Sequence, residues 1–142
     1  MERIVVVWLH LLAASAWVGV LLFVSHLVVP ALARGERAYL GLLARARVVA
    51  WAAIGLLVVT GFDNLRRDRL DSPWLMGNLL LVLVLLALAA HRDFTLVPRV
   101  SQVIEQGGSP SVALSALRWL DRVLLLVAMA VLFLGVGVAR GR

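Results

Sequence analysis

Apolar segments long enough to cross a lipid bilayer constrain the fold of this chain more than any other feature. About 20 apolar residues in a helix span the roughly 30 Å of bilayer hydrocarbon. The first such segment reads WLHLLAASAWVGVLLFVSHLVVP, from Trp8 to Pro30. The whole chain is 63% hydrophobic, whereas soluble domains are about 45–50% apolar. We therefore expect an integral membrane protein, with no nucleic-acid partner.

The polar residues between the apolar segments set their boundaries. We expect a single domain, residues 1–142, with spans at about residues 4–30, 39–62, 73–97 and 111–138. The stretch RVSQVIEQGGSP at 99–110 predicts a surface loop, and 63–72 a second polar loop. Ser72 before Pro73 is typical of a helix start, with the serine as N-cap. Ser109–Pro110 repeats this pattern before the last span.

Four spans with short connections favour one fold class. Only helices and closed barrels satisfy the backbone polar groups in lipid, and short connections join antiparallel neighbours. The chain is therefore predicted to be all-α: an antiparallel, up-down-up-down four-helix bundle. We expect it to cross the inner or plasma membrane several times, in contact with the lipid bilayer. Small residues in the first and last spans allow close helix contacts and leave a homo-oligomer open.

The charged residues exclude several kinds of chemistry. The chain has no cysteine, which excludes disulfides and thiolate sites, and all 14 basic residues are arginine, which excludes Schiff-base chemistry. We name the membrane face that holds the N-terminus side A, and the opposite face side B. The spans place six arginines on side A and eight on side B. This small excess favours side B in the cytoplasm by the positive-inside rule.

His10 lies about 9 Å into the first span, at a rise of 1.5 Å per residue. An ionisable residue inside a span is a functional hypothesis by default, and a buried imidazole needs a partner. Antiparallel threading places Thr60, Met76 and Asn78 at a similar depth. Asn78 or Thr60 could be that partner without any cofactor, and the alternative is that His10 is a metal or cofactor ligand.

Towards side B, His26 near the end of the first span is expected to meet His91 near the end of the third. Two neutral imidazoles can hold one copper ion or ligate one haem iron. Further polar residues are expected at this level: Arg45, Arg47, Arg92, Arg118 and Asp121. Arg45, Arg47 and Arg92 could bind haem propionates. The alternative is that these histidines bond backbone or lipid and the arginines reach the headgroups.

Spacing refines these two sets of candidates. His10 and His26 are roughly 24 Å apart along the helix axis, so they cannot share one metal ion. Arg118, Asp121 and Arg122 are expected on one face of the last span. Within spans, sulfur ligands for copper are limited to Met76 and Met129. The sequence thus offers two separate candidate sites.

Three motifs resemble a known membrane family. HLLAASAWVG at 10–19, TGF at 60–62 and AAHRDFTLVPR at 89–99 are similar to the CopD-like domain, and the resemblance covers essentially the whole chain. That family is named for copper resistance and proposed copper uptake. The resemblance implies a protein that binds or passes copper, through His10 or the His26/His91 pair.

A more distant resemblance is to the HemJ type of protoporphyrinogen oxidase, a membrane protein that binds haem b. His10 with Trp17 and Gly19 resembles that family's first-span motif, which implies that His10 is a haem ligand. The functional lysine of that family corresponds here to Asn78, and an amide cannot replace an ammonium group. Whether the chain is an enzyme stays open, and Asn78 favours a protein that is not one.

Three functional hypotheses follow. The first is a CopD-like protein that binds copper through His10, His26 or His91. The second is a haem b redox protein with an axial histidine and arginines on the propionates. The third is a cofactor-free structural or assembly protein in which the histidines only pack.

Overall fold

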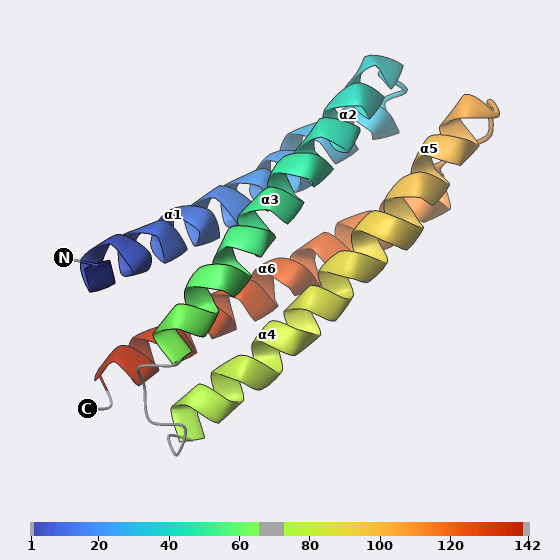
Figure 1. The fold of residues 1–142 in the computed structure, drawn as a ribbon. Coiled ribbons are helices and arrows are strands. Elements are labelled where there is room, and N and C mark those ends of the chain that lie inside the picture. Colours follow the sequence, from blue (N-terminus) through green and yellow to red (C-terminus); the bar gives the residue numbers. More distant parts are fainter. Residues whose placement is uncertain (1, 66–72, 141–142) are drawn as a thin grey trace.

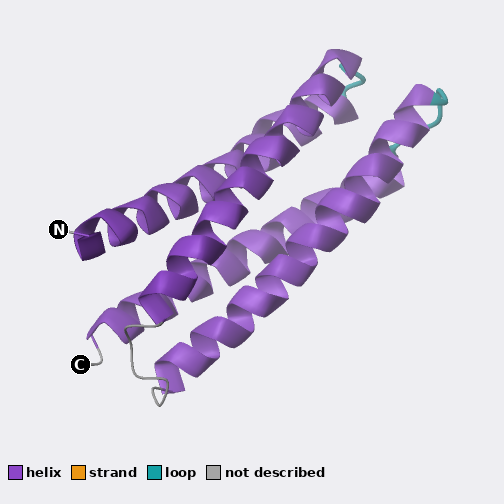
Figure 2. Cartoon of the chain, in the orientation of Figure 1, coloured by secondary structure: helices purple, strands orange, loops and turns teal. Residues whose placement is uncertain are grey.

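The structure is a computed structural model that describes residues 2–65 and 73–140. Every element within these residues is helical, and short turns connect them (Figure 2). In chain order the elements are α1 (Glu2–Phe23), the π-helix η1 (Val24–Val28), α2 (Val29–Ala33), the 3₁₀-helix η2 (Arg37–Tyr39), α3 (Leu40–Leu65), α4 (Pro73–His91), the π-helix η3 (Arg92–Leu96), α5 (Val97–Glu105) and α6 (Ser111–Arg140).

The predicted fold class is confirmed. Among the described residues, four helical segments are long and apolar enough to cross a membrane, by length and composition: Arg3–Ala33, Arg37–Asp63, Pro73–Glu105 and Ser111–Val138. Consecutive segments run in opposite directions (Figure 1). The turns after α2 and α5 lie at one end of the bundle, which is side B, and both chain termini lie at the other, which is side A.

The helices associate as two pairs. α1 packs along α3, and α4 packs along α6, while α1 and α2 also contact α6 (Figure 1). The most completely buried apolar side chains gather towards side B: Val24, Val28, Val29, Leu43, Val100, Leu114, Leu117 and Leu124. Many large apolar side chains along the rest of the spans are exposed, as expected for surfaces that face lipid.

Each pair contains a π-helix just before a proline. In η1 and its cap, the Val29 N–H bonds the carbonyl oxygen of Val24, five residues earlier, and Pro30 follows. In η3 and its cap, the Val97 N–H bonds the carbonyl oxygen of Arg92, and Pro98 follows. Proline has no N–H and its ring crowds the carbonyl group four residues earlier. A wider turn relieves this crowding, and a single turn within an α-helix is the usual form of the π-helix.

The extra residue of η3 changes which side chains face the core. Leu85, Ala89 and Arg92 are buried before the π-turn, and Val97, Val100 and Ile104 are buried after it. On an unbroken α-helix these two sets would be rotated from each other by roughly 100°. The π-turn brings both sets to the same side of the helix, and it lets the consecutive residues Arg92 and Asp93 both be buried.

The predicted loop at 99–110 is wrong over its first half. α5 extends to Glu105, because Val97, Val100 and Ile104 form a buried stripe at helical spacing while its charged residues and Gln102 are exposed. The chain turns only at Gly107, which has a φ of 74° that favours glycine.

Other boundaries follow the prediction closely. α4 begins at Pro73, as predicted, and its predicted N-cap Ser72 lies outside the described residues. α3 continues to Leu65, so only residues 66–72 of the predicted loop lie beyond it, also outside the described residues. α6 begins one residue after Pro110, whose carbonyl oxygen accepts the Leu114 N–H at 2.8 Å.

The two halves of the chain repeat one arrangement. In each, a long helix leads through a π-helix into a short helix that starts with Val-Pro, at Val29–Pro30 and Val97–Pro98. A turn with a left-handed glycine follows, Gly35 in the first half and Gly107 in the second. A second long helix, α3 or α6, then returns to side A.

Candidate functional site

His10 lies half-buried between α1 and α3, near side A. Its Nδ1 atom is 2.8 Å from the hydroxyl oxygen of Thr60, which is buried. This confirms Thr60 as the predicted partner of the imidazole. Gly61 lies beside the same ring, since a Cβ atom at that position would be 3.6 Å from His10 Cε1. Met76 is exposed and Asn78 is half-buried.

The hydrogen bonds of Thr60 determine the tautomer of His10. The Thr60 hydroxyl donates to the carbonyl oxygen of Leu56 at 2.7 Å. A hydroxyl has one proton, so towards His10 the Thr60 oxygen accepts, and Nδ1 of His10 carries the proton. In a neutral imidazole the other ring nitrogen then has a free lone pair. Nε2 of His10 is therefore the atom that can bind a metal ion or a proton.

His26 and His91 occupy exposed faces near side B. The Nδ1 atom of His26 is 2.7 Å from the Ser25 hydroxyl and 3.1 Å from the Leu22 carbonyl oxygen, both on its own helix. His91 is exposed in line with Leu80, Leu83 and Ala87. No hydrogen bond joins the two histidines in the described part of the chain, and a shared metal site stays a prediction.

Protein metal sites commonly combine three or more histidine, cysteine, aspartate or glutamate side chains. Within residues 2–65 and 73–140 no such group is close enough together to hold a metal ion.

The three predicted propionate ligands differ in exposure. Arg45 is exposed, Arg47 is half-buried, and Arg92 is buried with only 6% of its surface accessible. Arg47 precedes Thr60 by 13 residues on α3, which is roughly 20 Å along the helix axis. His10 and these arginines therefore lie at different levels of the bundle.

Arg92 belongs to a buried ion cluster, which we define as Arg92, Asp93 and Asp121. The Nε atom of Arg92 donates to Oδ1 of Asp121 at 2.5 Å, and its Nη1 atom donates to Oδ1 of Asp93. Asp121 is fully buried and Asp93 is 2% exposed. The cluster joins the third span to the fourth. Buried charges such as these are stable only when they are paired.

The prediction that Arg118, Asp121 and Arg122 share one face of the last span is wrong. Arg118 and Arg122 are exposed, whereas Asp121 points into the bundle, so the three do not form one polar face. The partner of Asp121 is Arg92 of the third span, which is distant in sequence.

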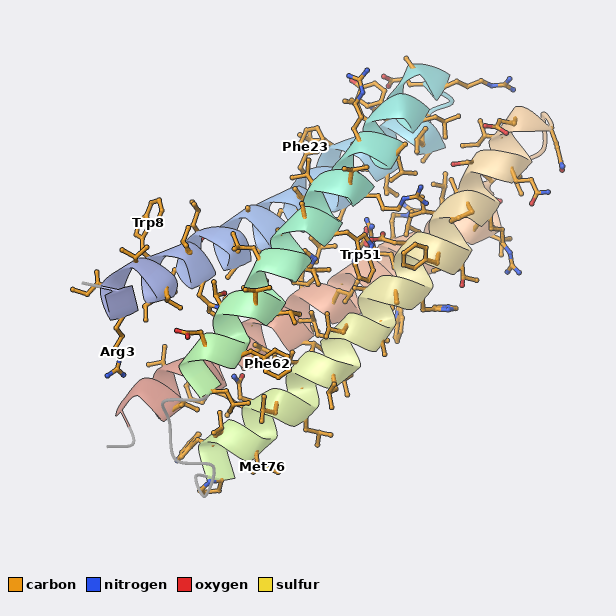
Figure 3. The ribbon with its side chains drawn as sticks, in the orientation of Figure 1. Arg3, Trp8, Phe23, Trp51, Phe62 and Met76 are labelled. Carbon is orange, nitrogen blue, oxygen red and sulfur yellow. The ribbon has the colours of Figure 1, made fainter. Side chains whose placement is uncertain are left out.

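The helix α3 completes the surroundings of the cluster. The Trp51 Nε1–H donates to Oδ2 of Asp93 at 2.9 Å, and its ring contacts Phe94 with centroids 5.2 Å apart. Figure 3 shows Trp51 directed from α3 towards the third span, in contrast to Trp8, which points away from the bundle. These contacts join the first half of the chain to the second.

Arg47 donates a hydrogen bond to a backbone carbonyl oxygen that the π-turn leaves without a helical donor. The Val97 N–H bonds the Arg92 carbonyl, and Pro98 has no N–H, so no helical donor remains for the carbonyl oxygen of Asp93. The Nη1 atom of Arg47 donates to this oxygen at 3.4 Å. The predicted role of Arg47 and Arg92 towards a haem stays a prediction, and it would compete with these contacts.

Sequence reasoning missed Asp93 and Trp51 as members of a site. Asp93 lies inside a span, and an intramembrane carboxylate is a signal in itself. The second signal is Pro98, five residues later, because a proline inside a span disturbs the helical hydrogen bonds of the turn before it. Trp51 gave no such signal, because a tryptophan in an apolar span is usually a packing residue.

The chain was also compared with known proteins. Neither a protein-family model, nor a curated protein, nor a solved structure matches it.

Proposed function

We propose that this chain is a multi-pass protein of the inner or plasma membrane that binds copper through Nε2 of His10 and passes it on. The tautomer of His10 is the observation that supports the proposal most. A metal-ligating histidine typically donates its other ring N–H to an oxygen acceptor, which fixes the ring and makes it a better ligand. Thr60 provides that acceptor at 2.8 Å.

The proposal uses an incomplete set of protein ligands. Imidazole suits copper, and a single imidazole leaves coordination positions open. A protein that passes an ion must bind it strongly enough to receive it and weakly enough to release it. The CopD-like resemblance of the motifs at 10–19, 60–62 and 89–99 agrees with this role.

A b-type haem with His10 as axial ligand is the second candidate, because the same Nε2 lone pair suits haem iron. When bound, such a haem would supply one-electron redox chemistry. Its propionates would need partners other than Arg92, which already bonds two carboxylates.

The test is metal analysis with oxidised and reduced absorption spectra, on protein purified in mild detergent after loading with Cu(I). Three variants are compared: His10→Ala, and the matched controls His26→Ala and His91→Ala, whose side chains are exposed. We expect near-stoichiometric copper in the wild type and both controls, and its loss in His10→Ala.

Other outcomes would contradict the proposal in distinct ways. A Soret band with stoichiometric iron that His10→Ala abolishes would replace copper by haem. A colourless, metal-free wild type whose three variants all fold and complement a deletion strain would leave the cofactor-free assembly role. Copper retained in His10→Ala would reject His10 as the ligand.

A further inference from the structure

The buried ion cluster has two polar atoms without hydrogen-bond partners. These are Nη2 of Arg92 and Oδ2 of Asp121, both fully shielded from solvent. The Asp121 side chain has no accessible surface at all. A buried polar atom without a partner is costly, so such atoms in a well-packed region indicate a ligand that completes them.

The charges of the cluster do not balance. It contains two carboxylates, Asp93 and Asp121, and one guanidinium, Arg92. From α3, Arg47 donates to the backbone oxygen of Asp93 rather than to a carboxylate, and it is only half-buried. From η1, His26 is close enough to interact electrostatically with Asp121, but it is exposed. One negative charge in the buried region thus lacks a buried partner.

We propose that Asp121 is a proton-binding group within the membrane-spanning bundle. Oδ2 of the Asp121 carboxylate takes up one proton from water and becomes a neutral carboxyl group, while Oδ1 keeps the hydrogen bond from Nε of Arg92. The buried cluster then holds one positive and one negative charge. Burial of an unpaired charge is far more costly than burial of a neutral polar group, which favours this uptake.

A small cavity beside the cluster offers room for water. Arg92 and Asp93 line it together with apolar side chains from the other spans, and it is about large enough for one water molecule. A water there would have the charged residues Arg92 and Asp93 on one wall of the cavity. Proton-binding carboxyl groups inside spans are the groups through which membrane proteins use proton gradients. This inference is independent of any metal at His10.

Infrared spectroscopy of the detergent-purified protein tests the proposal, because a protonated carboxyl group gives a carbonyl band distinct from that of a carboxylate. We expect such a band in the wild type near neutral pH, shifted by ¹³C-labelled aspartate. Asp121→Asn should lose it. The control Glu36→Gln, which alters an exposed ion pair with Arg34, should keep it.

A second variant keeps the test decisive if Asp121→Asn does not fold. Asp121→Glu retains a carboxyl group, so the band should remain but no longer shift with labelled aspartate. The absence of a protonated-carboxyl band in the wild type, between about pH 5 and pH 8, would overturn the proposal. A band that still shifts with labelled aspartate in Asp121→Glu would overturn it as well.

Discussion

At the scale of single residues, two polar partners organise this bundle: Thr60 for His10, and Arg92 for Asp121. The first could be predicted, because antiparallel threading of two straight helices places Thr60 and His10 at one depth. The second could not, because it depends on the π-turn that buries Arg92 and Asp93 together. Depth follows from counting residues, whereas the direction of a side chain depends on the local helix geometry.

Thr60→Val tests the role of Thr60 directly. Valine has nearly the same shape but no oxygen, so Nδ1 of His10 loses its acceptor and the ring its fixed tautomer. Loss of such an outer partner typically weakens metal binding by about 10–100-fold. We expect a fall of this size in copper affinity, measured by competition titration.

Thr60→Ser is the matched control, since it keeps the hydroxyl and should bind copper like the wild type. The tautomer can be measured independently by ¹⁵N NMR of the imidazole, in a background with His26→Asn and His91→Asn so that only His10 reports. Equal spectra for the valine and serine variants would contradict the assigned hydrogen bond.

At the scale of elements, the π-helix η3 decides the register of the third span. The apolar run of α4 predicted a helix, but the polar residues of α5 concealed its continuation. The buried stripe of Val97, Val100 and Ile104 was visible in the sequence at helical spacing. It is out of register with Leu85 and Ala89 by one residue, so a search for one continuous helical stripe does not join the two sets.

Deletion of Thr95, an exposed residue of η3, should be tolerated. A regular α-helix would then keep Arg92 on the same face as Val97, Val100 and Ile104, and only Asp93 would turn towards the edge. The expected costs are the crowding by Pro98 that the wide turn relieves and the loss of the Trp51–Asp93 hydrogen bond, about 1.5–3 kcal/mol for a charged acceptor. Unfolding in mixed detergent micelles measures their sum.

Deletion of Ala87 is the matched control, because it removes an exposed residue from the regular part of the same span. It rotates every later residue by roughly 100° relative to the part of α4 before residue 87. We therefore expect no stable, monodisperse protein. Equal damage by the two deletions would contradict the register argument.

At the scale of the whole molecule, the four spans and their antiparallel order could be predicted from composition and length alone. Hydrocarbon thickness fixes how many residues a span needs, and the chain provides four such runs. The packing of the spans as two pairs could not be predicted, because all four carry similar apolar residues.

The orientation in the membrane is a prediction at this scale. Side B presents arginines outside the buried ion cluster at seven positions: Arg34, Arg37, Arg45, Arg47, Arg99, Arg118 and Arg122. By the positive-inside rule we expect this side in the cytoplasm. The chain has no cysteine, so single cysteines report cleanly on access by a membrane-impermeant thiol reagent.

In intact cells, Gln106→Cys in the turn after α5 should stay unlabelled, and Pro73→Cys at the start of α4 should react. Both positions are exposed and uncharged, so neither change alters the count of arginines. The reverse labelling pattern would place side B outside the cytoplasm.

The repeated arrangement of the two halves bears on how such a protein could arise. Alignment of Val29–Pro30 with Val97–Pro98 sets Val24 and Ser25 opposite Arg92 and Asp93. If the halves descend from one duplicated hairpin, both copies began with the same side chains at this turn. The charges now belong to one copy, and their partner Trp51 to the other. In that case the backbone arrangement is older than the duplication. The ion cluster arose later, after the two copies had diverged in sequence.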